Sequence, residues 1–236
     1  MGSIGPGWAC YDALFFSPSS GLKPRRHVMR KVLIAAAIVA LAIPLALQAQ
    51  EGGVQADGWE ARLDRDGDIN GVLNFMSMGE GVHASTAGRG AAIFWRAGDA
   101  HSGNFTISAT FTQTEPSSHP NALGLFWGGS NLSAADQQYS YFVIREDGQY
   151  LLRKRVGSET PDVVAWTRHD AIKPLDGDGR ATNTLSVEVG ASQIRFLVND
   201  MEVDSQPRSS FDGDGIAGLR VNHQLDVHIG DINTGM

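Results

Sequence analysis

From about residue 57 onward, short runs of alternating apolar and polar residues are separated by turn residues. In Phe105–Thr112, apolar side chains occupy every second position, and threonine or serine occupies the others. A strand with this period directs its apolar side chains to one face and its polar ones to the other. The same period recurs in Thr184–Val189 and Gln193–Val198. The pattern therefore predicts strands with one buried face and one solvated face.

Turn residues predict how several of these strands are connected. Asp147-Gly148 separates the runs Tyr139–Glu146 and Gln149–Val156, and an Asp-Gly pair in this position is typical of a β-hairpin. Asn199-Asp200 predicts a second turn, which leads into Met201–Val203. Two more strands are expected at Gly90–Arg96 and Val163–Arg168, and one helical turn at Ala134–Gln138.

The density of short strands predicts the fold class. About ten to thirteen strands are expected in about 180 residues, and no segment after residue 50 keeps an apolar period of 3.6 residues over three turns. The 28 glycines fit a chain with many turns. We therefore expect an all-β fold, an antiparallel two-sheet jelly-roll sandwich, over residues 57–234.

The N-terminal part of the chain has a different pattern. Met29-Arg30-Lys31 precedes an apolar run of 16 residues, Val32–Leu47, and this order is typical of an export signal over residues 29–49. A membrane-spanning helix needs about 20 residues, so we expect cleavage after about Ala49 and a short linker over 50–56. The product would be periplasmic or extracellular, with no membrane attachment.

Two interpretations of residues 1–28 remain open. The first is a start codon assigned too early, with Met29 as the true start. The second is an extension of the basic region, in which Arg25–Arg30 loosely resembles a twin-arginine export signal. Both interpretations predict export.

Charge and cysteine content narrow the classes of partner. Residues 1–49 hold five of the 19 Lys and Arg and one of the 26 acidic residues, so the remainder carries a formal charge of −11. Such a surface argues against nucleic acid and anionic membranes as partners and leaves neutral ligands open. The one cysteine, Cys10, precedes the signal, so we expect no disulfide after cleavage.

Four motifs, taken in order, resemble a known family. They are Asp57-Gly58-Trp59, Asn121–Gly129, Asn183–Asn199, and Gly215–Leu219 followed by His223. Together they resemble the concanavalin A-like lectin/glucanase sandwich, and within it the 3-keto-disaccharide hydrolase-like (LamG/glycoside hydrolase 16-like) domain. The resemblance implies a saccharide ligand at a concave face or its rim, and some members hydrolyse glycosides. The Glu-x-Asp-x-Glu strand of the glucanases is missing here.

Aromatic and planar polar side chains are the candidates for holding a sugar. Alternation places Tyr139, Tyr141 and Arg145 on one face of their strand. The alternative is that these tyrosines fill the core with their hydroxyls satisfied. Trp127 stands beside two glycines, where a loop is expected to open.

The stretch GLRVNHQLDVHI, residues 218–229, adds further candidates. A bend at Asn222-His223-Gln224 would direct His223 along a cleft, with Arg220 as an additional rim contact. Asp226 and His228 are then expected to be solvated strand residues. The predicted ligand-binding residues are Trp127, Tyr141, Arg145, Asn222 and His223.

Metal and catalytic chemistry are weakly supported by the sequence. In the acidic run Asp64–Asp68, an EF-hand would need glycine and glutamate where Ile69 and Phe75 stand. No cofactor or metal ligand is therefore predicted, and a structural calcium ion is left open. Glycosidases need two carboxyl groups, about 5 Å apart if retaining and about 6.5–9.5 Å apart if inverting, and no such pair is evident. We therefore expect non-covalent glycan recognition, with a glycoside hydrolase or lyase, or a structural envelope domain, as alternatives.

Overall fold

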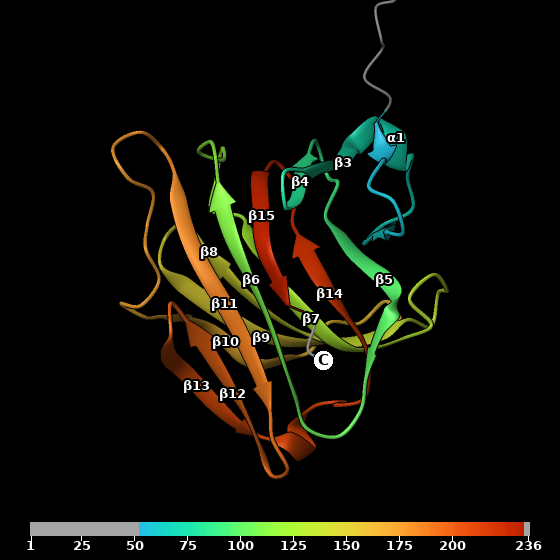
Figure 1. The fold of residues 1–236 in the computed structure, drawn as a ribbon, viewed down its shortest axis with the longest axis vertical. Coiled ribbons are helices and arrows are strands. Elements are labelled where there is room, and N and C mark those ends of the chain that lie inside the picture. Colours follow the sequence, from blue (N-terminus) through green and yellow to red (C-terminus); the bar gives the residue numbers. More distant parts are fainter. Residues whose placement is uncertain (1–51, 234–236) are drawn as a thin grey trace, which may run out of the picture. The chain divides into compact units, whose positions relative to one another are not determined.

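The computed structural model describes residues 52–233, and these form two β-sheets packed face to face (Figure 1). The predicted export signal (29–49) and the preceding segment (1–28) lie outside the described residues. No helix among residues 52–233 is long and apolar enough to cross a membrane.

The structure contains fifteen strands in this range. The eight-stranded sheet contains, in spatial order, β1 (Gly53–Val54), β3 (Leu73–Met78), β4 (Gly81–Thr86), β15 (Asp226–Asn233), β6 (Phe105–Gln113), β11 (Ala181–Val189), β12 (Gln193–Val198) and β13 (Met201–Pro207). The seven-stranded sheet contains β10 (Asp162–Arg168), β9 (Gln149–Val156), β8 (Gln138–Arg145), β7 (Ala122–Ser130), β14 (Gly215–Val221), β5 (Ala92–His101) and β2 (Glu60–Leu63). The helical elements are α1 (Ile69–Val72) and the 3-10 turn η1 (Arg208–Ser210).

The strand pairing confirms the predicted all-β sandwich. Every pair of neighbouring strands is antiparallel except β1 and β3, which are parallel. The predicted hairpin joins β8 to β9, with Gly148 at φ +81°. Asn199 and Asp200 form the turn between β12 and β13, both with positive φ.

Two local predictions were wrong. Residues 131–136 form turns rather than a helix, and Gln138 begins β8. The sandwich also begins before residue 57, because Gly53–Val54 pairs with β3 and the Ala56 side chain is buried.

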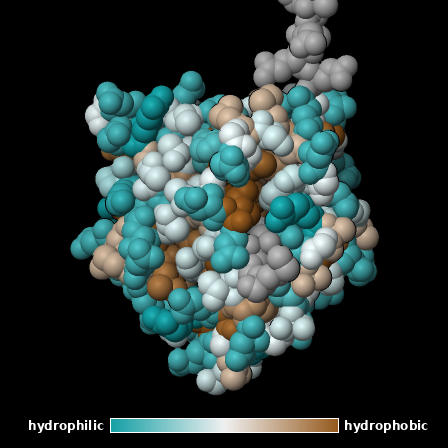
Figure 2. Space-filling view, in the orientation of Figure 1, coloured by the Kyte–Doolittle hydropathy of each residue, from teal (hydrophilic) through white to brown (hydrophobic). Residues whose placement is uncertain are grey.

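The two sheets differ in how many of their faces are buried. In β6, buried residues alternate with partly exposed ones, so one face of the eight-stranded sheet contacts the core and the other contacts water. In β7, every residue from Ala122 to Gly129 is buried. The seven-stranded sheet is therefore covered on both faces near its centre. On the side seen in Figure 2, the surface is mostly hydrophilic, with small hydrophobic areas.

Aromatic rings fill the core between the sheets. Phe75 stacks on Phe94 with ring centroids 4.2 Å apart. Trp127 is fully buried and contacts Phe196 and Phe211 at centroid distances of 5.6 and 5.3 Å. Each such side chain contributes on the order of 1.5–3 kcal/mol to stability through its burial.

A second, smaller cluster covers the outer face of the seven-stranded sheet. Its buried members are Ile93, Trp95, Ala122, Phe126, Leu132, Tyr139, Tyr141, Val143 and Leu151. Gly218 of β14 makes room for this cluster, because a Cβ there would lie 2.6 Å from Cε1 of Phe126 and 2.2 Å from the carbonyl oxygen of Phe94. The candidate site lies beside this cluster, and Tyr141 belongs to both.

Candidate functional site

A cavity of about 620 Å³ opens on the outer face of the seven-stranded sheet. We call it the outer-face cavity. Its lining residues come from β8, β9 and β14 and from the loops that follow β2, β4, β9 and β14. They are Asp64, Arg65, Arg89, Ala91, Tyr141, Arg153, Arg155, Ser158, Thr160, Arg220, Asn222 and His223.

Arg220 is the most deeply buried charged residue of the cavity. Alternation along β14 sends Leu219 and Val221 into the core and Arg220 to the outer face. Its guanidinium donates to both carboxylate oxygens of Asp64, with Nη1 3.0 Å from Oδ1. Nη1 also lies 3.0 Å from the Tyr139 hydroxyl oxygen. A buried charge needs such partners, because an unpaired one would be strongly destabilising.

Tyr141 supplies the aromatic surface of the cavity. The Arg220 guanidinium lies over its ring, 4.6 Å from the centroid. Tyr139 packs beside it, with ring centroids 5.7 Å apart. Tyr141 and Arg220 are only 3% and 5% exposed, so the stacked pair fixes one wall of the cavity and leaves little ring face open to a ligand.

Burial and charge together fix the protonation states in this part of the site. Burial alone would raise the pKa of Asp64, but the charges of Arg220 and Arg155 and the hydrogen bonds from Arg220 hold it below its usual value. Burial raises the pKa of Tyr139 to about 12, with the Asp64 charge adding to the shift. Asp64 is therefore a carboxylate and Tyr139 a neutral phenol at physiological pH.

Two arginines of β9 form one wall of the cavity. The β8–β9 register places Arg153 opposite Tyr141 and Arg155 opposite Tyr139. Arg153 pairs with Asp162 of β10. Arg155 donates from Nε to the Gly157 carbonyl at 2.6 Å, and its Nη1 lies 3.9 Å from Oδ1 of Asp64.

The predicted bend between β14 and β15 is confirmed and forms part of the cavity rim. The backbone N–H of Asn222 donates to the Ala122 carbonyl at 2.8 Å, and Gln224 adopts a positive φ of +55°. Thr86 binds the bend from the other sheet: its hydroxyl donates to the Asn222 carbonyl at 2.6 Å, and its backbone N–H donates to the Leu225 carbonyl at 2.8 Å. The bend is thus tied to both sheets.

His223 stands on this rim beside a second histidine. Its ring is nearly perpendicular to that of His119, with centroids 5.2 Å apart. Burial lowers the pKa of His223, and the charges of His119, Arg65 and Arg89 lower it further. His223 is therefore neutral at physiological pH.

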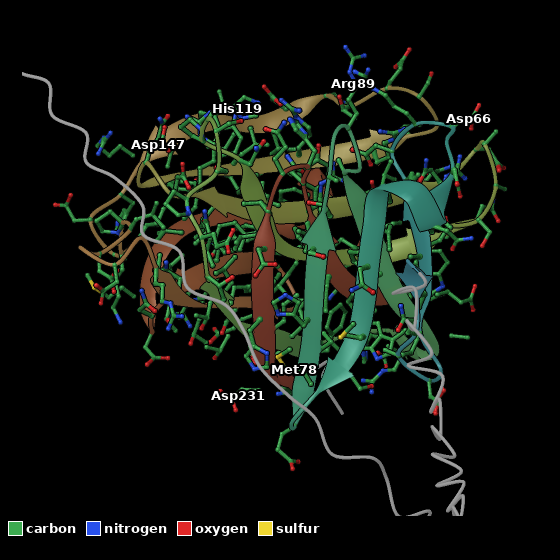
Figure 3. All side chains as sticks on the ribbon, turned by 90° about the horizontal axis from the view of Figure 1, so that it is seen from above. Asp66, Met78, Arg89, His119, Asp147 and Asp231 are labelled. Atoms are coloured by element: carbon green, nitrogen blue, oxygen red, sulfur yellow. The ribbon has the colours of Figure 1, made fainter. Side chains whose placement is uncertain are left out.

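Arg65 and Arg89 complete the rim from two loops. Both side chains are exposed, and neither makes a hydrogen bond or ion pair with another residue of the range 52–233. In Figure 3, Arg89 and His119 project from the edge of the sandwich opposite to Met78 and Asp231.

Three of the five predicted ligand-binding residues meet in this cavity: Tyr141, Asn222 and His223. Arg145 lies on the same face of β8 but outside the cavity, where it pairs with Asp147 and stacks on Trp166 at 4.1 Å. Trp127 requires a correction. It faces the core between the sheets with no exposed surface, so it cannot stack on a ligand.

Asp226 and His228 lie on the other sheet, away from the cavity. His228 pairs in register with His83 of β4, and Nε2 of His83 lies 3.2 Å from Oδ2 of Asp226. Both are partly buried rather than fully solvated. Within residues 52–233, no group of three or more His, Cys, Asp or Glu side chains is placed to hold a metal ion.

Sequence reasoning missed most of the arginines. A signal was present for Arg153 and Arg155, because the predicted hairpin register sets them opposite the two tyrosines. The acidic run Asp64–Asp68 suggested only a calcium loop, and no sequence pattern pointed to Arg65 or Arg89, which come from the loops after β2 and β4.

Comparison with solved structures finds a β-sandwich of similar fold at low sequence identity. The carbohydrate-binding module CBM66 from Bacillus subtilis superposes with a TM-score of 0.53 at 14% identity, covering 74% of this chain and 93% of that one. This likeness shows a shared fold. A Bacillus subtilis protein of unknown function with a galectin-like fold gives a TM-score of 0.49 at 13% identity, covering 77% and 95%. Sheep galectin-11, in complex with glycerol, gives 0.40 at 12% identity, covering 64% and 99%. No family model and no curated protein matches the sequence.

Proposed function

We propose that this domain binds a saccharide non-covalently in the outer-face cavity. The observation that carries the proposal is a cavity of about 620 Å³ on the outer face of the seven-stranded sheet, lined by guanidinium, hydroxyl, amide and imidazole groups. Ligand sites of this size usually combine a preformed shape with a few fixed polar groups. The sandwich fold shared with a carbohydrate-binding module supports the same class of ligand.

Hydrolysis of the bound glycan is the less supported alternative. Of the residues that line the cavity, Asp64 is the one with a carboxyl group. Its pKa is lowered and both its oxygens accept from Arg220, so it is poorly suited to act as a general acid. A glycosidase of the usual kind needs a second carboxyl group within about 10 Å. Membership of the 3-keto-disaccharide hydrolase-like family therefore stays a prediction, as does a purely structural role in the envelope.

Export also belongs to the proposal. The basic and apolar pattern of residues 29–49 supports it. We accordingly propose that the sandwich meets its ligand in the periplasm or outside the cell.

Retention of the purified protein on a panel of immobilised polysaccharides tests the binding function. We expect delayed migration or depletion with at least one polymer, and a loss of that retention in Asn222→Ala and His223→Ala. Arg195→Ala is the matched control, because Arg195 is an exposed residue on the outer face of the eight-stranded sheet. Retention that is unchanged in the cavity variants would move the site elsewhere, and no retention on any polymer would contradict the proposal.

A further inference from the structure

The charge of the outer-face cavity points to a narrower ligand class than saccharides in general. Five arginines and one aspartate are among its lining residues, in a chain whose formal net charge is −7. Arg220 and Arg155 share Asp64, and Arg153 pairs with Asp162. Five arginines less these two carboxylates leave an excess of three positive charges at the cavity, because His223 is neutral.

Arg65 and Arg89 hold the part of this charge that is available to a ligand. They reach the cavity from the loops after β2 and β4, and both lie close enough to His223 to lower its pKa. Neither side chain has a hydrogen-bonding or ionic partner within residues 52–233. Asp66 and Asp68 follow Arg65 in the same loop, but neither lines the cavity.

Guanidinium groups match particular anions in shape as well as charge. The planar fork of arginine donates two parallel hydrogen bonds to a carboxylate or to an oxyanion of the sulfate or phosphate type. A neutral sugar gives no reason for two arginine side chains without partners at the rim of one cavity. A negatively charged substituent on the sugar would supply the missing hydrogen-bond acceptors.

We infer that the outer-face cavity takes an anionic saccharide, one that carries a carboxylate or a sulfate ester. Arg65 and Arg89 bind the charged group, while Asn222 at the rim contacts the sugar itself. This inference rests on the proposed saccharide binding and specifies its ligand.

Matched pairs of polymers test the inference. Affinity electrophoresis of the purified protein would compare polygalacturonate with its methyl ester, and dextran sulfate with dextran. We expect retention by at least one charged polymer and at least tenfold weaker retention by its neutral partner. The charged polymer that is retained identifies the group as carboxylate or sulfate.

The outcomes separate this inference from the proposed function. Equal retention by a charged polymer and its neutral partner, or retention of neutral polymers only, overturns the anionic specificity and leaves saccharide binding intact. If the protein is retained by none of these four polymers and by no polymer of the wider panel, both the anionic specificity and the proposed saccharide binding are overturned. Equal retention of single-stranded DNA would show a general affinity for polyanions and would overturn the saccharide part.

Variants of Arg65 and Arg89 test whether these two side chains bind the charged group of the polymer. Because a hydrogen bond to a charged group is worth about 1.5–3 kcal/mol, Arg65→Ala and Arg89→Ala should each weaken retention of the charged polymer by roughly tenfold or more. Arg65→Lys, which keeps the charge and loses the fork, should fall in between. Arg195→Ala should retain wild-type affinity, and wild-type affinity in the Arg65→Ala, Arg89→Ala double variant would overturn the assignment.

Discussion

The two outer faces of the sandwich are built from opposite chemistry. On the eight-stranded sheet, hydroxyl pairs such as Thr110–Thr184 alternate with exposed ion pairs in which Arg195 contacts Glu188 and Glu202. On the seven-stranded sheet, aromatic side chains are buried and Arg220 is ion-paired beneath the surface. An arginine in water is mobile and contributes little. An arginine held by buried partners has a fixed position and shapes the cavity, while the exposed side chains of Arg65 and Arg89 remain available to a ligand.

The largest expected effect is at Phe126, which is fully buried on the outer face of the seven-stranded sheet. Phe126→Ala should lower the free energy of unfolding by about 3–5 kcal/mol, because a large cavity would open beside Gly218 and Tyr139. Urea denaturation followed by tryptophan fluorescence measures the change. Thr110→Ala on the opposite outer face is the control, expected within about 1 kcal/mol of wild type. Equal losses would show that the two faces do not differ in burial.

The second expected effect is at the Arg220–Asp64 pair. Arg220→Met leaves the Asp64 carboxylate without its main partner and should cost about 3 kcal/mol of stability. The double variant Arg220→Met, Asp64→Leu should recover much of that loss, because no buried charge remains unpaired. On the opposite face, Arg195→Met should leave the denaturation midpoint unchanged. A double variant less stable than Arg220→Met would show that the pair contributes beyond mutual neutralisation.

The smallest expected effect is the pH dependence at His223. Its pKa is lowered below 6.5 in the folded protein, so the unfolded chain binds more protons between that lowered value and 6.5. Stability should therefore decrease as pH falls through this window, and His223→Asn should reduce the slope. Thermal denaturation at several pH values measures it.

The affinity for a ligand should change with pH in the opposite direction to stability, and through the same residue, His223. Protonated His223 adds positive charge beside Arg65 and Arg89, so retention of dextran sulfate, which stays ionised, should strengthen as pH falls below 6.5. His119→Asn is the companion variant, because His119 is the titratable neighbour of His223. A pH-independent retention in the wild-type protein would contradict a role for His223 in the cavity.

Most of the fold and part of the candidate site could be predicted from the sequence, and individual strands show why. Alternation in β6 and β11 revealed which side chains face the core, because one face of that sheet meets water. The run Ala122–Gly129 is apolar throughout and buried throughout, so its pattern could not show that Trp127 faces inward. Tyr141 and His223 were found by alternation and by the bend. Arg65 and Arg89 depend on how separate loops converge in space, which no local pattern records.

The bend between β14 and β15 has a consequence for dynamics. Its backbone is hydrogen-bonded to Ala122 of one sheet and to Thr86 of the other. Asn222 and Leu225 can therefore lose these bonds only when the two sheets separate. Their amide hydrogens should exchange with solvent as slowly as those of the central strands, and only through global unfolding. Amides in the loops that hold Arg65 and Arg89 should exchange much faster. One side of the cavity would then be as rigid as the core, while the other adapts to whatever enters.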